Sequence, residues 1–170
     1  DQTARLWDAA TGQQIRSFKG HDGWVFSAQF SNDGKWVVTA SDDATARLWE
    51  AATGQQIRSF KGHDSRVTSA QFSNDGKWVV TASFDQTARI WDAATGQQIR
   101  AFKGYGSKVT SAQFSHDGKW VLTASDDKTA RLWDAGTGQQ IRAFKGHDSK
   151  VTSAQFSNDD KWVVTASDDK

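Results

Sequence analysis

The chain has 170 residues, of which 36% are hydrophobic, and its 21 basic and 20 acidic residues leave a formal net charge of +1. This balance argues against a dedicated nucleic-acid-binding protein, and no apolar run approaches the ~18–20 residues that a membrane-spanning helix needs. The absence of cysteine excludes disulfides, thiolate nucleophiles and cysteine-based metal sites. No signal-peptide pattern opens the sequence, so we take the cytoplasm as the default expectation for its location.

The sequence consists of four copies of one unit of 42 residues. Residues 1–42 and 43–84 are identical at 36 of 42 positions, so the copies have diverged little. Such self-similarity is typical of folds that stack one structural unit on the next. Tryptophan marks the interval at Trp7, Trp49, Trp91 and Trp133.

Within the unit that spans residues 20–61, each segment is predicted to be a short strand or a turn. The first apolar series slips by one position after Val25, which predicts a β-bulge near the start of the first strand. Gly34 supplies the positive φ of a hairpin turn, and the charge-free, β-branched run that follows is typical of a strand covered on both faces. An alternating strand and a polar outer strand complete the unit. In chain order, the four strands are predicted over residues 25–30, 36–41, 45–49 and 55–60.

Four strands in 42 residues, separated by glycine-containing turns, are the pattern of one blade of a β-propeller. Helical repeats of similar length need long apolar stripes with a period of about 3.6 residues, and these short segments rich in Val, Thr and Trp do not contain them. We therefore predict an all-β fold, a β-propeller built from four-stranded antiparallel blades.

Three segments of this unit, Gly20-His21, Ser41-Asp42-Asp43 and Leu48-Trp49, resemble the Gly-His … Trp-Asp signature of WD-repeat β-propellers. The resemblance covers the entire chain. It implies a non-enzymatic scaffold for protein–protein interaction, without a cofactor or a metal. The Trp-Asp pair itself stands at Trp7-Asp8, Trp91-Asp92 and Trp133-Asp134, and one copy has Trp49-Glu50 instead.

The same resemblance implies a buried hydrogen-bond network in each blade, which joins a loop histidine, a strand serine or threonine, the tight-turn aspartate and the tryptophan indole. In the third set Tyr105 replaces histidine, and a phenol cannot bridge two partners as an imidazole does, so this network is expected to be incomplete. Carried over to this sequence, the sets are His21, Ser41, Asp43 and Trp49; His63, Ser83, Asp85 and Trp91; Ser125, Asp127 and Trp133; and His147 and Ser167 with Asp1 or Asp169 and Trp7.

Serine, histidine and aspartate together also suggest the catalytic triad of a hydrolase. A triad needs an accessible serine in a cleft with an oxyanion hole, and a domain carries one of them. Here the set recurs in successive copies beside a tryptophan whose N–H needs a partner when it is buried. We therefore interpret the sets as structural and expect no enzyme activity. One histidine per repeat, without neighbouring carboxylates at ligand spacing, is a weak metal signal.

In propellers of this family a blade runs outward from its inner strand, so the chain is expected to begin and stop inside a blade. Each half-blade would leave an unpaired sheet edge, which propellers avoid by closing the ring. We expect a head-to-tail homodimer that forms one eight-bladed ring, because eight blades turn by roughly 45° each and four would have to turn by roughly 90°. The predicted units are a half-blade over 1–19, blades over 20–61, 62–103 and 104–145, and a half-blade over 146–170.

The positions that differ between the copies predict where a partner binds. In propellers of this family they lie on the face formed by the loops that enter the inner strands and by the tight turns after the second strands, where partners commonly dock. Aromatic and arginine side chains at such a rim are typical interface anchors. Neutral drift of unconstrained loops is the alternative explanation. The candidate partner-binding residues are Trp24, Phe26, Asp42, Arg66, Phe84, Lys108, Asp126 and Lys150.

Two other functions remain open from the sequence. One is a piece of a longer repeat array, or an engineered chain, with no activity beyond propeller assembly; the start at Asp1 without methionine favours it. The other is a carbohydrate-binding propeller, which is less favoured because it would repeat its aromatic in every blade and Trp24 occurs once. No nucleic-acid or membrane partner is expected.

Overall fold

A computed structural model describes residues 1–169 of the chain. Within this range sixteen strands form three four-stranded sheets and two two-stranded sheets, and every strand pair is antiparallel. The prediction of an all-β fold with four-stranded antiparallel blades is confirmed. Among the described residues there is no helix with the length and apolarity needed to cross a membrane.

Each sheet takes its strands in chain order, and we name the sheets by their place along the chain. The N-terminal half-sheet contains β1 (Thr3–Trp7) and β2 (Gln14–Lys19). Sheet I contains β3 (Val25–Phe30), β4 (Trp36–Ser41), β5 (Ala46–Glu50) and β6 (Gln56–Phe60). Sheet II contains β7 (Val67–Phe72), β8 (Trp78–Ser83), β9 (Ala88–Asp92) and β10 (Gln98–Phe102). Sheet III contains β11 (Val109–Phe114), β12 (Trp120–Ser125), β13 (Ala130–Asp134) and β14 (Gln140–Phe144). The C-terminal half-sheet contains β15 (Val151–Phe156) and β16 (Val163–Ser167).

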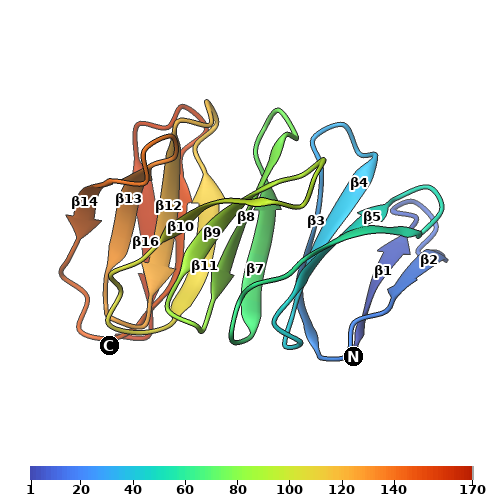
Figure 1. Cartoon of the computed structure of the whole chain (residues 1–170), viewed down its shortest axis with the longest axis horizontal. Coiled ribbons are helices and arrows are strands. Elements are labelled where there is room, and N and C mark those ends of the chain that lie inside the picture. The colour runs from blue at the N-terminus through green and yellow to red at the C-terminus, as the bar shows by residue number, and fades with distance from the viewer. Residues whose placement is uncertain (170) are drawn as a thin grey trace.

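From the N-terminal half-sheet to sheet III the sheets follow one another along the longest axis of the molecule, and the C-terminal half-sheet overlaps sheet III in this view, at the end opposite the N-terminus (Figure 1). The first strands of successive sheets, β3, β7, β11 and β15, pack against one another. Each sheet therefore packs mainly against the sheet before it and the sheet after it, as expected for a stacked repeat.

The second strand of each full sheet is its most deeply buried strand. In β4, residues 37–41 are all buried, which agrees with the charge-free sequence of this strand. The first strand has the predicted bulge, because its register with β4 shifts between Val25 and Ser27. The hairpin turn between them contains Gly34 at a φ of 71°, whereas the last copy has Asp160 there at a φ of 57°. A left-handed conformation at a residue other than glycine costs roughly 1 kcal/mol, so Asp160 strains its turn.

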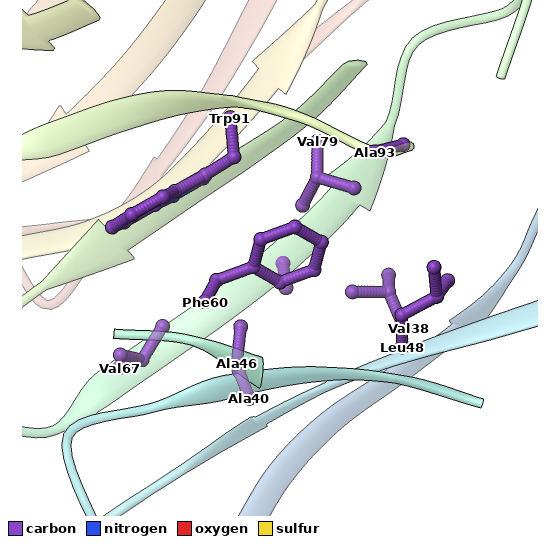
Figure 2. Packing of buried hydrophobic residues seen from close by; sticks show 10 residues of the cluster. Val38, Ala40, Ala46, Leu48, Phe60, Val67, Val79, Trp91 and Ala93 are labelled. Atoms are coloured by element: carbon purple, nitrogen blue, oxygen red, sulfur yellow. The ribbon is translucent and has the colours of Figure 1, made fainter. Parts of the chain in front are cut away.

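The apolar core lies between neighbouring sheets. One cluster joins Val38 and Phe60 of sheet I to Val79 and Trp91 of sheet II, and Figure 2 shows the Phe60 ring at its centre. The ring centroids of Phe60 and Trp91 are 5.9 Å apart. The outer-strand phenylalanine of one sheet thus packs on the third-strand tryptophan of the next. The same pair recurs as Phe18–Trp49 and Phe102–Trp133.

The two half-sheets leave apolar side chains exposed that the full sheets bury. Trp7 is 52% exposed, while its counterpart Trp49 in sheet I is 1% exposed. Val164 is 65% exposed, while its counterpart Val38 is completely buried. Trp49 packs on Phe18 of the preceding sheet, and Val38 packs against sheet II, which follows it. Within residues 1–169, β1 has no preceding sheet and β16 has no following sheet, and each also lacks one neighbouring strand that its counterpart has in sheet I.

Candidate functional site

Each full sheet contains a buried hydrogen-bond network centred on a threonine of its second strand. In sheet I the His21 Nε2 atom lies 2.7 Å from Thr39 Oγ1, and Trp49 Nε1–H donates to the same oxygen over 2.9 Å. The His21 Nδ1 atom lies 2.7 Å from Asp43 Oδ2. Sheet II repeats these contacts at distances of 2.7 to 2.8 Å, with His63, Thr81, Trp91 and Asp85.

The hydroxyl that joins histidine and tryptophan is therefore Thr39, and the prediction of Ser41 for this place is wrong. Positions 39 and 41 lie on the same face of β4, because side chains alternate along a strand, so the sequence pattern does not separate them. Thr39 lies opposite Arg47 in the middle of the strand pair, within reach of both rings. Ser41 lies at the strand end, where its Oγ accepts the Asp43 N–H over 3.2 Å. The same correction holds in the other copies, where Thr81, Thr123 and Thr165 occupy the places predicted for Ser83, Ser125 and Ser167.

The contacts of the network fix the protonation of its members. Burial lowers the pKa of His21 below its usual 6.5, and the hydrogen bond with Asp43 opposes this only in part, so the imidazole is neutral at pH 7. Burial alone would raise the pKa of Asp43, but hydrogen bonds from Thr45 and His21 outweigh it and lower that pKa to about 2. A neutral imidazole protonated at Nδ1 donates to Asp43 and accepts the Thr39 O–H. The Thr39 oxygen then accepts the indole N–H, and each group has a partner.

Sheet III carries the variant in which Tyr105 stands in place of histidine. The Tyr105 hydroxyl donates to Thr123 Oγ1 over 2.8 Å, and the side chain is buried. Burial raises the pKa of this phenol, so it stays protonated and remains a donor. Arg131 Nη2 donates to Asp127 over 2.7 Å, a shorter contact than the 3.3 Å of the corresponding pair in sheet I. The phenol thus reaches the threonine, and the arginine pairs with the carboxylate.

The fourth network is divided between the two ends of the molecule. His147 lies 2.8 Å from Thr165 Oγ1 and 2.8 Å from Asp169 Oδ2 in the C-terminal half-sheet. Trp7, the tryptophan of this register, lies in β1 at the opposite end of the molecule (Figure 1). Asp1 lies at that end too and binds Arg5 at 2.9 Å. Of the two aspartates considered from the sequence, Asp169 is the one that contacts His147.

The hydrogen-bond network joins the strands of a sheet, and its central hydroxyl is not accessible to a substrate. Thr39 is completely buried, and its oxygen is already engaged by the imidazole and the indole. Acyl transfer needs an accessible nucleophile beside an oxyanion hole, which a buried and fully engaged hydroxyl does not provide. Within residues 1–169, no three histidine, aspartate or glutamate side chains come together as metal ligands.

The candidate partner-binding residues lie at one end of the sheets, where the loop before the first strand meets the tight turn after the second. We call this end, defined by the eight candidates named above, the loop face. In each copy a backbone hydrogen bond of 2.9 to 3.2 Å joins the turn residue to the loop residue. The pairs are Asp42–Trp24, Phe84–Arg66, Asp126–Lys108 and Asp168–Lys150.

Side chains of neighbouring sheets contact one another across the loop face. Arg66 Nε binds Asp42 Oδ1 at 3.0 Å. The Arg66 guanidinium lies 5.4 Å from the ring centroid of Phe26 and 5.0 Å from that of Phe84. Lys108 Nζ lies 4.5 Å from the centroid of Phe84 on the same face. Cations this close to an aromatic ring form cation–π contacts, so these five candidates make up one continuous cluster.

The other three candidates contact different residues. Trp24, whose carbonyl accepts the Asp42 N–H, is 63% exposed. Lys150 binds Asp168 at 3.1 Å, and its pKa is raised first by this hydrogen bond, with a smaller contribution from Asp126. Sequence analysis missed Arg47 as a network residue. Its regular place in the repeat, four residues after the tight-turn aspartate, was the available signal.

The similarity to known proteins is found separately in each repeat of the chain. The family described as WD domain, G-beta repeat matches residues 12–50, 54–92, 96–134 and 138–170. The Nuclear distribution protein PAC1 of Komagataella phaffii is 40% identical over 43 residues, which are 25% of this chain and 9% of that protein. The Lissencephaly-1 homolog of Heterostelium pallidum is 38% identical over 39 residues, 23% of this chain and 9% of that protein. Ribosome assembly protein 4 of Chaetomium thermophilum is 46% identical over 37 residues, 22% of this chain and 7% of that protein.

Each of these alignments is about as long as one repeat, and it spans less than a tenth of the length of each of these three relatives. The family match is more extensive, because its four segments together cover most of the sequence. Each of the first three segments ends directly after the Trp-Asp or Trp-Glu pair of the third strand. The chain therefore belongs to the WD-repeat family.

Proposed function

We propose that this chain is a non-enzymatic scaffold that binds protein partners through its loop face. The observation that carries the proposal is the exposed aromatic surface of Trp24 and Phe26, which are 63% and 41% exposed, beside the Arg66 cluster. Aromatic and arginine side chains supply most of the binding energy at many protein interfaces. The printed names of two relatives, a nuclear distribution protein and a ribosome assembly protein, support a role in the organisation of assemblies.

Selection from a phage-displayed library of random dodecapeptides tests this proposal. Peptides enriched on the wild-type chain are expected to bind the Trp24→Ala/Phe84→Ala double variant at least about ten-fold more weakly, because both anchors are lost. The matched control is Ile57→Ala/Ile99→Ala, which truncates two exposed apolar side chains of the outer strands and should leave binding unchanged. Equal binding to both variants would place the site elsewhere. A large fall in the Tm of the first variant would mean that its side chains belong to the core.

We also propose that two copies of the 170-residue chain assemble head to tail into one eight-bladed ring. The observation in favour is the exposure of Trp7, Trp162 and Val164, at 52%, 74% and 65%, on the two half-sheets. The strands β15 and β16 correspond to the first and second strands of a full sheet, and β1 and β2 correspond to the third and outer strands. Pairing β16 of one copy with β1 of the second would bury these side chains and remove two open sheet edges.

The full sheets supply the register for this junction. In sheet I, β4 pairs with β5 so that Val37 lies opposite Trp49 and Val38 lies opposite Leu48. The same register at the junction would set Val163 opposite Trp7 of the second copy, and Val164 opposite Leu6 of the second copy. In this register the Trp7 indole donates to Thr165 Oγ1. The fourth network, with His147 and Asp169 already in contact, would then have the composition that sheets I and II have.

Contacts between the first strands extend the same junction. The Thr68 and Thr110 hydroxyls donate to the carbonyls of Val109 and Val151 in the following sheet, over 3.1 and 2.7 Å. Thr152 ends this series and donates over 3.2 Å to Ala166 O of its own half-sheet. In the proposed ring its acceptor is the carbonyl of Val25 of the second copy.

The molar mass in solution, measured by light scattering on a size-exclusion column, tests the ring. We expect a value near twice the 18.7 kDa of one chain. Trp7→Arg would place a charge at the buried junction and is expected to give the mass of one chain, whereas Trp24→Ala on the loop face should leave the mass doubled. A wild-type mass of one chain would overturn the proposed ring and leave the fold untouched.

A further inference from the structure

The loop face follows one rule at two of its loop cations: the cation pairs with the carboxylate of a tight turn. Between sheets I and II this is the ion pair of Asp42 with Arg66, at 3.0 Å. In the C-terminal half-sheet it is the ion pair of Asp168 with Lys150, at 3.1 Å. Each of these two cations therefore contacts a carboxylate of a tight turn.

The contact between sheets II and III departs from this rule. Phe84 takes the place of the turn aspartate, and its ring centroid lies 4.5 Å from Lys108 Nζ. In the loop of the same copy, Gly106 stands where the three other copies have Asp22, Asp64 and Asp148. Of the residues that the structure describes, no carboxylate forms an ion pair with Lys108, whereas Arg66 and Lys150 each have one. Lys108 thus contacts an aromatic ring where Arg66 and Lys150 contact a carboxylate.

An apolar surface adjoins this cation. Rings and cations alternate across the loop face from Phe26 to Arg66, Phe84 and Lys108. The other copies have threonine where Phe26 stands, so the apolar end of the series is particular to sheet I. A ring face attracts an ammonium group more weakly than a carboxylate does, so Lys108 would gain from an anion supplied by a partner.

We infer that this surface binds an acidic peptide segment that also carries an aromatic or long aliphatic side chain. A carboxylate of the peptide takes the place beside Lys108 that aspartate occupies at the other contacts, and the apolar side chain packs on Trp24 and Phe26. This inference rests on the proposed scaffold function of the loop face and adds the chemistry of its partner. A polyanion such as nucleic acid fits less well, because Asp42 and Asp126 on the same face would repel its phosphates.

The probe is the set of peptides enriched from the random dodecapeptide library on the wild-type chain. We expect them to contain more Asp and Glu than Lys and Arg, together with an aromatic or long aliphatic residue. Lys108→Glu should weaken the binding of synthetic copies by about ten-fold or more, because it sets like charges against each other. Lys119→Glu is the matched control: the same charge reversal in the same sheet, at a lysine that is paired with Asp117 in the hairpin at the opposite end from the loop face, should change Kd less than about two-fold.

A charge exchange separates attraction to Lys108 from general damage to the surface. Replacing the acidic residue of a peptide by lysine is expected to abolish binding to the wild-type chain and to restore it to Lys108→Glu. Enriched peptides that are neutral or basic, or that lose equal affinity to both charge reversals, would overturn the inference. The scaffold proposal would survive that result if Trp24→Ala/Phe84→Ala still weakened binding. Peptides indifferent to all loop-face variants would overturn both.

Discussion

Sheets II and III have nearly the same sequence but differ at the residue that leads into the first strand. In sheet II, His63 joins Thr81 to Asp85, whereas Tyr105 in sheet III donates to Thr123. Both sheets keep the hydrogen bond from the tryptophan indole to the threonine, at 2.8 and 3.0 Å. The tryptophan–threonine bond is therefore the constant part of the network, and the histidine is the replaceable part.

An arginine of the third strand makes the replacement tolerable. Arg131 binds Asp127 at 2.7 Å in sheet III, while Arg89 binds Asp85 at 3.1 Å in sheet II. The Arg131 guanidinium also lies 4.9 Å from the ring centroid of Tyr105. A largely buried carboxylate is costly unless it is paired, and in both sheets the arginine supplies that partner.

The largest expected loss of stability comes from removing the tryptophan of the network in each sheet. Trp91→Ala and Trp133→Ala each delete a buried ring that packs on a phenylalanine of the preceding sheet. We expect each to lower the free energy of unfolding by about 3–5 kcal/mol, with similar values in the two sheets. Denaturant unfolding followed by circular dichroism measures this. A much smaller loss for Trp133→Ala would show that Tyr105 holds sheet III in another way.

A smaller effect should distinguish the threonine from the serine two positions later. Thr81→Val keeps the shape of the side chain but leaves the His63 Nε2 atom and the Trp91 N–H without their partner. We expect it to cost about 2–4 kcal/mol, because each buried unpaired group costs about 1–3 kcal/mol. The control Ser83→Ala, which removes the acceptor of the Asp85 N–H and the donor to the Ser65 carbonyl, should cost less, about 1–2 kcal/mol. The reverse order of these losses would restore serine as the central hydroxyl.

Exchanging tyrosine and histidine at this place should change the free energy of unfolding less than the tryptophan substitutions or Thr81→Val do. Tyr105→His gives sheet III an imidazole that reaches both Thr123 and Asp127, as His63 reaches its two partners in sheet II. One added hydrogen bond is expected to raise the free energy of unfolding by about 1 kcal/mol. The opposite exchange, His63→Tyr, should lower it by a similar amount. Destabilisation by Tyr105→His would show that the packing lost with the larger ring outweighs the hydrogen bond gained to Asp127.

The sequence predicted the strand features that depend on local side-chain alternation, and it missed contacts that depend on how strands and sheets pack. The slip after Val25 and the charge-free run that follows predicted a bulge and a buried strand, because both are local consequences of side-chain alternation. The choice between Thr39 and Ser41 was not predictable from that alternation, since both point to one face. The contact of Arg66 with two phenylalanines was also missed, because it depends on how neighbouring sheets pack.

The last expected effect is a pH dependence of stability that differs between the two kinds of network. Burial lowers the pKa of His63, so the unfolded chain takes up a proton more readily than the folded one. This contribution to stability is fully present above the unfolded value of about 6.5 and is lost as the pH falls below it, by at most ~1.4 kcal/mol per pH unit for each histidine. Asp43, whose pKa is lowered to about 2, adds a second loss below pH 3.8.

His63→Tyr isolates the histidine contribution, because a buried phenol stays protonated throughout this range, as it does in sheet III. Unfolding free energies measured at pH 7.5 and pH 5.0 should differ less for this variant than for the wild type. Tyr105→His should widen the same difference, since it adds a third buried imidazole bound to an aspartate. Parallel changes in all three proteins would mean that these imidazoles do not control acid stability. The networks of sheets II and III would then be equivalent in their response to acid, and their difference would be confined to which side chain holds the carboxylate.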